Sequence, residues 1–276
     1  NQDGKGGIVE PGGGCNLMIM ASRLGAHVSA IGAVGADAFG ANLLEMLQAE
    51  GIDVSEVQYP QGSRTTLVLV LTDPDQHLHT FIGAYGEGDL AVYTEATHRV
   101  VKSADALLIQ GYNLYERRVV GMMFDAIGQA KQLGIPVYMD AGPTLHIVDG
   151  DAIAKALSFV DILMLTEDEI AGVSDGKTGE KAYNYLFGKG IHTVVVKQGE
   201  NGCSILRKNA REQIAGFSVP VVDTVGAGDC FDAGFILATL QKHSPHEAAV
   251  MANAVGAATA TKLGAGRNVP NRDEVN

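Results

Sequence analysis

The run Asp223-Thr224-Val225-Gly226-Ala227-Gly228-Asp229 is the most informative stretch of this 276-residue chain. It follows the apolar residues 217–222 and precedes an apolar-periodic stretch over 230–240, which indicates a turn between an extended segment and a helix. The first turn of a helix has unpaired backbone N–H groups and a partial positive charge, so it attracts phosphate. Glycine at two positions lets the backbone approach that anion closely. The run therefore predicts a phosphate-binding turn.

Asp229 lies inside this turn, where its carboxylate would repel the phosphate that the turn attracts. The economical explanation is that Asp229 accepts a proton from a hydroxyl group that attacks the phosphate. Asp232 lies on the same helical face and is a competing base, but it is one turn further from the anion site. We therefore favour Asp229 as the base and predict phosphoryl transfer.

Composition and charge narrow the class of protein. Hydrophobic residues make up 46% of the chain and charged residues 19%, which indicates a substantial buried core rather than disorder. The formal net charge of −12 argues against a nucleic acid partner, because binding its backbone requires a basic surface. An anionic substrate such as ATP would need Mg²⁺ and local backbone donors, since the overall field opposes its approach.

The cysteines and the apolar runs give expectations about location. Cys15, Cys203 and Cys230 are scattered and form no CxxC pair, which disfavours a disulfide framework or a zinc site and fits a reducing cytoplasm. No apolar run reaches membrane-spanning length and no signal peptide is visible, so we expect no membrane partner.

Apolar segments alternate with helical patterns along most of the chain. The expected helices are 16–24, 38–50 and 116–133, and the expected strands are 28–34, 64–71, 78–82, 106–110, 135–139, 162–165 and 193–196. Continuous apolar strands between helices predict a parallel sheet that is covered on both faces. The second and third strands flank Asp73-Pro74-Asp75-Gln76 and predict a hairpin outside that sheet. We expect one α/β domain over 1–276, with a β lid from about 5–10 and 64–83.

Polar residues follow several of the expected strands. Asp140, Thr166 with Glu169, 197–199 and 223–229 each come directly after a strand. Ligands of parallel α/β sheets bind beyond the carboxyl ends of the strands, so we expect these residues to converge on one edge of the sheet.

The stretch 171–178 (AGVSDGKT) satisfies a relaxed phosphate-loop pattern in which Ala171 replaces the first glycine. The pattern requires a loop that joins a buried strand directly to a helix, and an acidic segment over 167–170 intervenes here. A solvated loop between helices is the favoured interpretation. A phosphate-loop NTPase that uses Lys177 and Thr178 is kept as a rival.

Two histidine pairs and one acidic triplet could be taken for metal ligands: His77 with His79, His243 with His246, and Glu167-Asp168-Glu169. The histidines have no carboxylate or cysteine companions in sequence, so we favour surface histidines. The acidic triplet is either a charged first helical turn or the source of a metal-binding or water-binding group, and both alternatives stay open.

A second glycine cluster, Pro11-Gly12-Gly13-Gly14-Cys15-Asn16, opens a helix. It is either a flexible N-terminal turn or a close backbone approach to a polyhydroxylated ligand. In the second case the Asn16 amide offers a donor and an acceptor together.

These motifs together resemble the ribokinase/PfkB family of carbohydrate kinases over essentially the whole chain from Gly12 onward. The run 223–229 looks like the C-terminal signature of that family, which is highly specific. The segments 12–16 and 32–40 look like its N-terminal signature, and 196–202 and 252–258 also have counterparts there. The resemblance implies a ribokinase-like three-layer α/β/α sandwich with a mainly parallel central sheet and a small β lid.

The resemblance also implies transfer of the ATP γ-phosphate to a hydroxymethyl group of a furanose, a related sugar or a nucleoside. By this match Asp229 is the base, and the amides of Gly226, Ala227 and Gly228 form the anion hole. The implied substrate-binding residues are Gly12, Gly13, Gly14, Asn16, Gln110 and Asp140. The implied nucleotide-binding residues are Lys197, Gly199, Gly202, Thr224 and Asn253. Glu169 would bind Mg²⁺ through water, and Asp223 with the Val225 backbone would lie near a monovalent cation such as K⁺.

Three departures from the family pattern matter. Thr166 stands where the family has Asn in an Asn-x-x-Glu pattern, and the N-terminal glycine motif is one residue shorter than in ribokinase and lacks its lysine. The first strand of the family, with a substrate-binding Asp, would lie upstream of residue 1. A catalytically impaired sugar- or nucleotide-binding protein of the same fold is therefore the alternative. Lid strands with exposed edges often pair, which makes a homodimer through the lid a further expectation.

Overall fold

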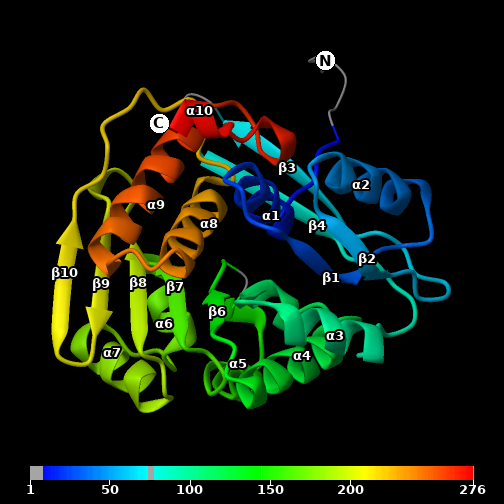
Figure 1. The fold of residues 1–276 in the computed structure, drawn as a ribbon, viewed down its shortest axis with the longest axis horizontal. Coiled ribbons are helices and arrows are strands. Elements are labelled where there is room, and N and C mark those ends of the chain that lie inside the picture. Colours follow the sequence, from blue (N-terminus) through cyan, green and yellow to red (C-terminus); the bar gives the residue numbers. More distant parts are fainter. Residues whose placement is uncertain (1–8, 74–77, 144, 276) are drawn as a thin grey trace.

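A six-stranded sheet forms the centre of the computed structural model, which describes residues 9–73, 78–143 and 145–275 (Figure 1). The strand order is β10-β9-β8-β7-β6-β5. The strands are β5 (Leu107–Gln110), β6 (Val137–Asp140), β7 (Ile162–Thr166), β8 (Thr193–Lys197), β9 (Cys203–Arg207) and β10 (Ala210–Ile214). Strands β5 to β8 run parallel to one another, β9 runs antiparallel to β8, and β10 runs antiparallel to β9. The predicted mainly parallel sheet is confirmed.

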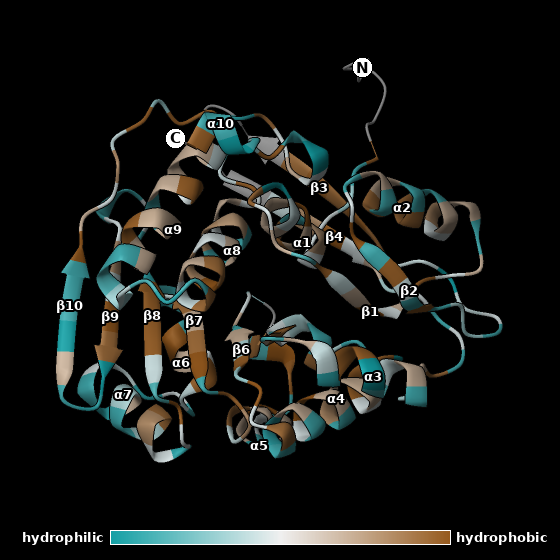
Figure 2. Cartoon of the chain, in the orientation of Figure 1, coloured by the Kyte–Doolittle hydropathy of each residue, from teal (hydrophilic) through white to brown (hydrophobic). Residues whose placement is uncertain are grey.

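The inner strands are buried because their residues are apolar on both faces of the sheet. Leu163, Met164 and Leu165 in β7 are all 0% exposed. The edge strand β10 reads AREQI, and its first four residues are exposed. Figure 2 shows this difference as brown inner strands and a mostly teal β10. An apolar run with no alternation thus marks an inner strand, as the sequence indicated.

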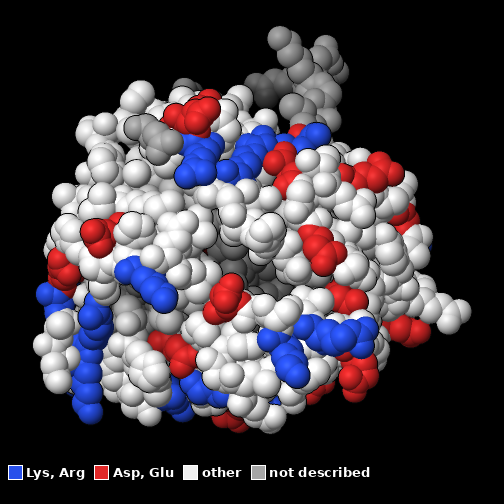
Figure 3. Space-filling view, in the orientation of Figure 1, with Lys and Arg blue, Asp and Glu red and all other residues white. Residues whose placement is uncertain are grey.

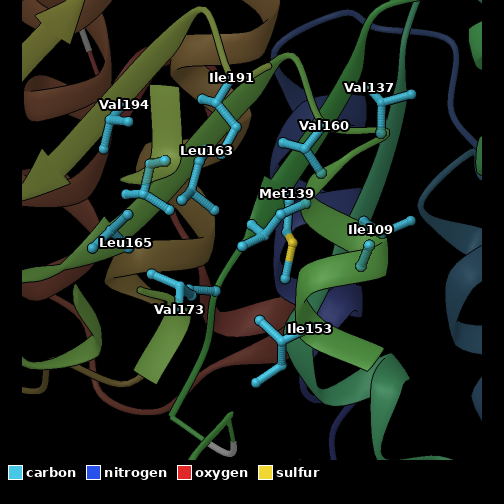
Figure 4. Close-up of a cluster of buried hydrophobic side chains, with 14 of the residues drawn as sticks. Ile109, Val137, Met139, Ile153, Val160, Leu163, Leu165, Val173, Ile191 and Val194 are labelled. Atoms are coloured by element: carbon cyan, nitrogen blue, oxygen red, sulfur yellow. The ribbon is translucent and has the colours of Figure 1, made fainter. Parts of the chain in front are cut away.

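Helices cover both faces of the sheet, so the domain has three layers. Alternate residues of each strand enter two different cores: Leu163 and Leu165 pack in one, shown in Figure 4, and Met164 packs in the other. The helices that contribute to the first core are α3 (Glu95–Ser103), α4 (Val120–Leu133), α5 (Gly150–Leu157), α6 (Ile170–Val173) and α7 (Gly179–Gly188). Those that contribute to the second are α8 (Ala227–Leu240) and α9 (Pro245–Ala260).

The remaining elements form a third core and the lid. Helices α1 (Gly14–Arg23) and α2 (Ala38–Ala49) and the parallel strands β1 (Ser29–Ala33) and β2 (Asp53–Gln58) share a buried cluster with α8. The hairpin of β3 (Leu67–Asp73) and β4 (Leu78–Ala84) lies outside the central sheet, and α10 (Arg272–Val275) completes the helices in the described part. No helix in the described ranges is long and apolar enough to cross a membrane.

The predicted hairpin is present, and its apolar side chains are uncovered. Leu69 and Ile82 form a cross-strand pair and are 56% and 53% exposed, and Val68 on the other face is 52% exposed. The expected lid segment 5–8 and most of the predicted turn lie outside the described residues. A two-stranded hairpin with both faces exposed fits a lid that needs a partner surface.

The start of the lid is held by the residue that caps α2. Asp37 accepts hydrogen bonds from the Gly40 N–H (2.9 Å) and from the backbone N–H and hydroxyl of Thr65 (2.9 and 2.7 Å). The N–H of Thr65 is the main reason that the pKa of Asp37 is lowered to about 2, with the Gly40 N–H adding to it. One carboxylate therefore fixes both a helix and the chain that enters β3.

Two sequence expectations differ from the structure. The helix expected from 116 begins at Val120, because Arg118 is buried and donates to the Arg64 carbonyl and to Glu116 at the base of the lid. The segment 217–222 carries no strand, although the turn after it does lead into α8 as predicted. The elements β2, α3, α5, α7, β9 and β10 were given no residue ranges from the sequence.

Candidate active site

The ends of β6 and β8 meet the start of α8 at one edge of the sheet. Lys197, the last residue of β8, places its Nζ 2.8 Å from Asp140 Oδ1 at the end of β6. The same nitrogen lies 2.9 Å from Asp232 Oδ2 on α8. All three side chains are at least nine-tenths buried. The structure therefore brings together Asp140 and Lys197, as the sequence predicted, and adds Asp232 to them.

Asp229 is held by two neutral amides from distant parts of the chain. Asn16 Nδ2 on α1 donates to Asp229 Oδ2 (2.8 Å), and Gln110 Nε2 at the end of β5 donates to Asp229 Oδ1 (3.0 Å). The Gly266 N–H donates to Asn16 Oδ1 (2.8 Å), and the Tyr112 hydroxyl donates to Gln110 Oε1. These outer donors fix which end of each amide faces the carboxylate.

The surroundings of Asp229 raise its pKa from 3.8 to about 7. Burial is the largest cause, because it removes the water that stabilises the charged form, and the nearby charge of Asp140 adds to it. The amides of Asn16 and Gln110 and the charge of Lys197 act in the opposite direction. A carboxyl that titrates near neutral pH is suited to accept a proton and release it again.

The turn that opens α8 requires glycine. Gly226 is the N-cap residue and has φ of 80°, in the left-handed region. In the described part of the chain, the N–H groups of Gly226 and Gly228 have no backbone acceptor, whereas Ala227 donates to the Thr224 carbonyl (3.2 Å). Two of the three amides predicted for an anion hole are thus free of backbone partners.

The glycine cluster that opens α1 packs closely against the residues after β5. Gly13 has φ of 55°, and a Cβ there would lie 2.8 Å from the Tyr112 hydroxyl oxygen. A Cβ at Gly14 would lie 2.4 Å from Gln110 Oε1. Gly12 precedes them and is exposed. Side chains at 13 and 14 would displace Gln110, so the cluster protects the contact between Gln110 and Asp229.

Asp223 connects the turn before α8 to the C-terminal loop. Its Oδ1 accepts the Val225 N–H (3.0 Å), and its Oδ2 accepts the Gly264 N–H (2.9 Å). The side chain is buried. Asp223 and Val225, the predicted neighbours of a monovalent cation, are therefore adjacent in space as well as in sequence.

Glu169 lies on the same edge of the sheet, in a short helical turn after β7. Its Oε2 accepts the Thr166 N–H (2.8 Å). Burial raises the pKa of Glu169, and the charge of Asp140 adds to this effect. In the described ranges no group of three His, Cys, Asp or Glu side chains is arranged to hold a metal ion directly.

Three predicted nucleotide-binding residues form a separate group around residues 214–216. The Asn253 Nδ2 donates to the Ala215 carbonyl (3.1 Å). Gly202 has φ of 83°, and a Cβ there would lie 2.1 Å from the Ile214 carbonyl oxygen. Gly199 begins the turn that contains Gly202, between β8 and β9. Thr224 is exposed beside the α8 turn instead.

The phosphate-loop pattern at 171–178 begins within α6 and ends directly before α7, so it does not join a strand to a helix. Lys177 Nζ pairs with Asp175 Oδ2 at 2.6 Å on the surface. The preferred interpretation, a solvated loop between helices, is confirmed.

The histidines at the start of α9 are on the surface. His246 lies 2.6 Å from Glu212, and His243 lies 3.9 Å from Glu247. Both histidine side chains are about half exposed or more, as the sequence indicated. His77 and the side chain of His79 lie outside what the structure describes.

Three contributors to the site were not predicted from the sequence. Tyr112 has no motif around it, and only the contact with Gln110 reveals it. Gly264 and Gly266 belong to a Gly-Ala-Gly stretch at 264–266, which was a usable signal for backbone donors.

Figure 3 shows that the molecular face is hollowed near its centre, between α8 and β1 as labelled in Figure 1. A different recess of about 480 Å³ includes Ile191 and His192, just before β8. It therefore lies at the opposite end of β8 from Lys197. Because ligands of such sheets bind at the carboxyl ends of the strands, the edge with Asp229 is the candidate active site.

Comparisons with known proteins agree on one family. The model of the pfkB family carbohydrate kinases matches residues 9–272. The ribokinase of Haemophilus influenzae is 29% identical over 97% of this chain and 86% of its own length. Probable fructokinase-7 of Arabidopsis thaliana is 28% identical over 96% of this chain and 82% of its own. A candidate ribokinase II from E. coli, solved with ATP and Mg²⁺, superposes with a TM-score of 0.87 at 25% identity, covering 100% of this chain and 91% of its own.

The raised pKa of Asp229 predicts a pH-dependent stability. The unfolded side chain titrates near 3.9 and the folded one at about 7, so between these pH values the folded state holds a proton that the unfolded state has lost. Wild-type stability therefore falls as pH rises through this window. Relative to wild type, Asp229→Asn should gain on the order of 1–3 kcal/mol in free energy of unfolding between pH 5 and pH 8.

Urea unfolding at both pH values measures this change, with the exposed Asp168→Asn as the matched control. An unchanged difference between wild type and Asp229→Asn at the two pH values would contradict the raised pKa.

Proposed function

Because the chain belongs to the pfkB family of carbohydrate kinases, we propose that it transfers the γ-phosphate of ATP to a hydroxymethyl group of a sugar, with Asp229 as the general base. The chain is a carbohydrate kinase of the ribokinase and fructokinase type. The observation that carries the assignment of Asp229 is its position: a carboxyl with a pKa of about 7, held by two neutral amides in the first turn of α8.

Phosphoryl transfer requires positioning and charge stabilisation more than covalent chemistry from the protein. Asp229 takes the proton of the attacking hydroxyl group, which makes the oxygen a better nucleophile. The amides of Gly226, Ala227 and Gly228 stabilise negative charge on the transferred phosphoryl group. Gly226 and Gly228 support this role, since neither N–H has a backbone acceptor within the described ranges.

The substrate that fits this edge of the sheet is a neutral polyhydroxylated molecule, either a furanose, a related sugar or a nucleoside. Asn16 and Gln110 hold Asp229 and have further polar capacity for sugar hydroxyls. The proposed sugar-binding set is Gly12, Gly13, Gly14, Asn16, Gln110 and Asp140. Names of the relatives favour ribose and fructose as first candidates.

The nucleotide is proposed to extend from the α8 turn toward residues 214–216. Gly202 and Asn253 contact that segment, Gly199 begins the turn that ends at Gly202, and Thr224 lies exposed at the α8 turn. Lys197 completes the set that the family pattern implies. We also propose a cytoplasmic location, which the use of ATP and the three free buried cysteines support.

The residues at this edge fit a need for Mg²⁺. Asp140, Glu169, Asp229 and Asp232 are close enough to influence one another, and Lys197 is the cation among the described residues that hydrogen-bonds to members of this group. Mg²⁺ would offset the repulsion between these acids and the ATP phosphates. Glu169 would hold it through water. We also propose K⁺ near Asp223 and the Val225 carbonyl.

A binding protein of the same fold without catalysis is the second candidate, because Thr166 replaces the family Asn and here donates its N–H to Glu169. The phosphate-loop alternative loses its structural context, since Lys177 and Thr178 lie between two helices on the surface.

Asp229→Asn is expected to keep ATP binding and to lose turnover by on the order of 10²-fold or more, because an amide cannot accept the proton. Sugar-dependent ADP release measures turnover, and calorimetry measures ATP binding. Lys177→Ala is the control and should leave turnover unchanged. Near-normal turnover in Asp229→Asn would exclude it as the base, and loss of turnover in Lys177→Ala would support the phosphate-loop alternative.

A substrate panel separates the enzyme from the binding protein. ADP release is measured with D-ribose, D-fructose and adenosine, each with and without Mg²⁺. We expect ADP release that depends on both one of these compounds and Mg²⁺. Binding of a sugar without ADP release would support the impaired protein instead.

The exposed apolar faces of β3 and β4 lead us to propose a homodimer through the lid. The double variant Leu69→Asp, Ile82→Asp should convert a dimer to a monomer, because it places charge on the face formed by this cross-strand pair. Sedimentation measures the mass. Leu133→Asp, on the exposed end of α4, is the control. A wild-type monomer, or a variant that stays dimeric, would contradict the proposal.

A further inference from the structure

Three carboxylates approach the start of α8, and they do not have the same partners. Asp140 and Asp232 each receive a hydrogen bond from the Lys197 ammonium (2.8 and 2.9 Å). Asp229 receives hydrogen bonds from neutral amides instead. The cation is thus shared between the two carboxylates that the proposed reaction does not use as its base.

We propose that Lys197 is a positioning residue for phosphoryl transfer: its ammonium neutralises Asp140 and Asp232 and leaves Asp229 as the carboxylate that accepts the proton of the substrate. The inference rests on the proposed function, in which Asp229 is the base. This role differs from direct contact with the nucleotide, because Lys197 acts here through Asp140 and Asp232.

The geometry places Lys197 where this role is effective. Its side chain is 10% exposed and that of Asp232 is 0% exposed, so water screens the charges weakly. A Cβ on Gly228 would lie 3.5 Å from Lys197 Nζ, which puts the ammonium against the backbone directly before Asp229. The two ion pairs also tie α8 to the ends of β6 and β8.

Asp232 is unsuited to take a substrate proton. Its Oδ2 is bound to Lys197, and its Oδ1 is buried without a hydrogen-bond partner in the described part of the chain. A sugar hydroxyl group has no access to a fully buried side chain. Burial raises the pKa of Asp232, and the charge of Lys197 opposes that rise.

Titratable side chains from several elements belong to or surround the cluster formed by Asp229, Asp140, Asp232 and Lys197. The titratable side chains concerned are Cys15 on α1, Tyr112 after β5, Asp140 on β6, Glu169 after β7, Lys197 on β8, and Cys230 and Asp232 on α8. Among the charged ones, Asp140 raises the pKa of Asp229 and Lys197 lowers it. Burial alone would lower the pKa of Lys197, but the charges of Asp140 and Asp232 outweigh burial and raise it, so the ammonium stays charged. Removing it leaves Asp140 facing Asp229 without compensation.

The pH dependence of kcat/KM in Lys197→Met tests this role, with the sugar that gives the fastest ADP release in the panel. The acidic limb of the profile should move up by about one to three pH units, because a nearby opposite charge shifts a carboxyl by that amount. At pH 7 this is a loss of roughly five-fold or more, and the loss should shrink as pH rises through the shifted limb. Lys197→Arg keeps the charge and should keep the wild-type limb. Lys208→Met, on the exposed β9–β10 turn, is the matched control.

An acidic limb that does not move, or a loss that is equal at every pH, would overturn the inference. If circular dichroism shows that Lys197→Met is not folded, the double variant Lys197→Met, Asp232→Asn replaces it, since the fully buried acid Asp232 is then neutral and only Asp140 is left without its cation. The same upward movement is expected, because Asp140 still faces Asp229, and its absence would overturn the inference. If Lys197→Met keeps wild-type activity and its acidic limb does not move, the role of Lys197 is overturned and the assignment of Asp229 as the base is unaffected. If Asp229→Asn keeps its turnover, the assignment of Asp229 as the base is overturned.

Discussion

Burial of a carboxylate against neutral amides is the constraint on which the site depends. Asn16 and Gln110 reach Asp229 across 213 and 119 residues of chain, so α1, β5 and α8 must be correctly packed before both bonds form. The close approach of Gly14 to Gln110 and the Gly266 N–H on Asn16 hold these amides in place. The fold therefore holds one partly buried carboxyl group in a position where it titrates near neutral pH.

The same edge of the sheet holds two acids of one helix in different surroundings. Asp232 is one turn beyond Asp229 and is paired with Lys197 in the interior. Asp229, in the first turn of α8, instead accepts hydrogen bonds from the side-chain amides of Asn16 and Gln110. Position along the helix decides which acid is buried with the cation and which one is held by neutral amides. The acids at this edge and the formal net charge of −12 both oppose the approach of an anionic ligand such as ATP.

The strongest local signals in the sequence predicted much of this architecture. Apolar runs such as 162–165 and 193–196 could be recognised as inner strands, and the run 223–229 as the turn before a helix, because each depends on neighbouring residues. Contacts between distant segments could not be predicted in this way. Tyr112 on Gln110, and the C-terminal loop on Asn16 and Asp223, arise only when the chain folds. The β9–β10 hairpin was missed because β10 reads as a polar edge segment.

Titration of the Asp229 carboxyl carbon by ¹³C NMR in the wild-type protein, compared with the acidic limb of its kcat/KM profile, tests the central claim most directly. Asp229→Asn assigns the resonance. The account predicts that the carboxyl and the kinetic limb titrate together at about pH 7. A carboxyl that titrates near 4, or a kinetic limb that does not follow it, would contradict the assignment of Asp229 as the base.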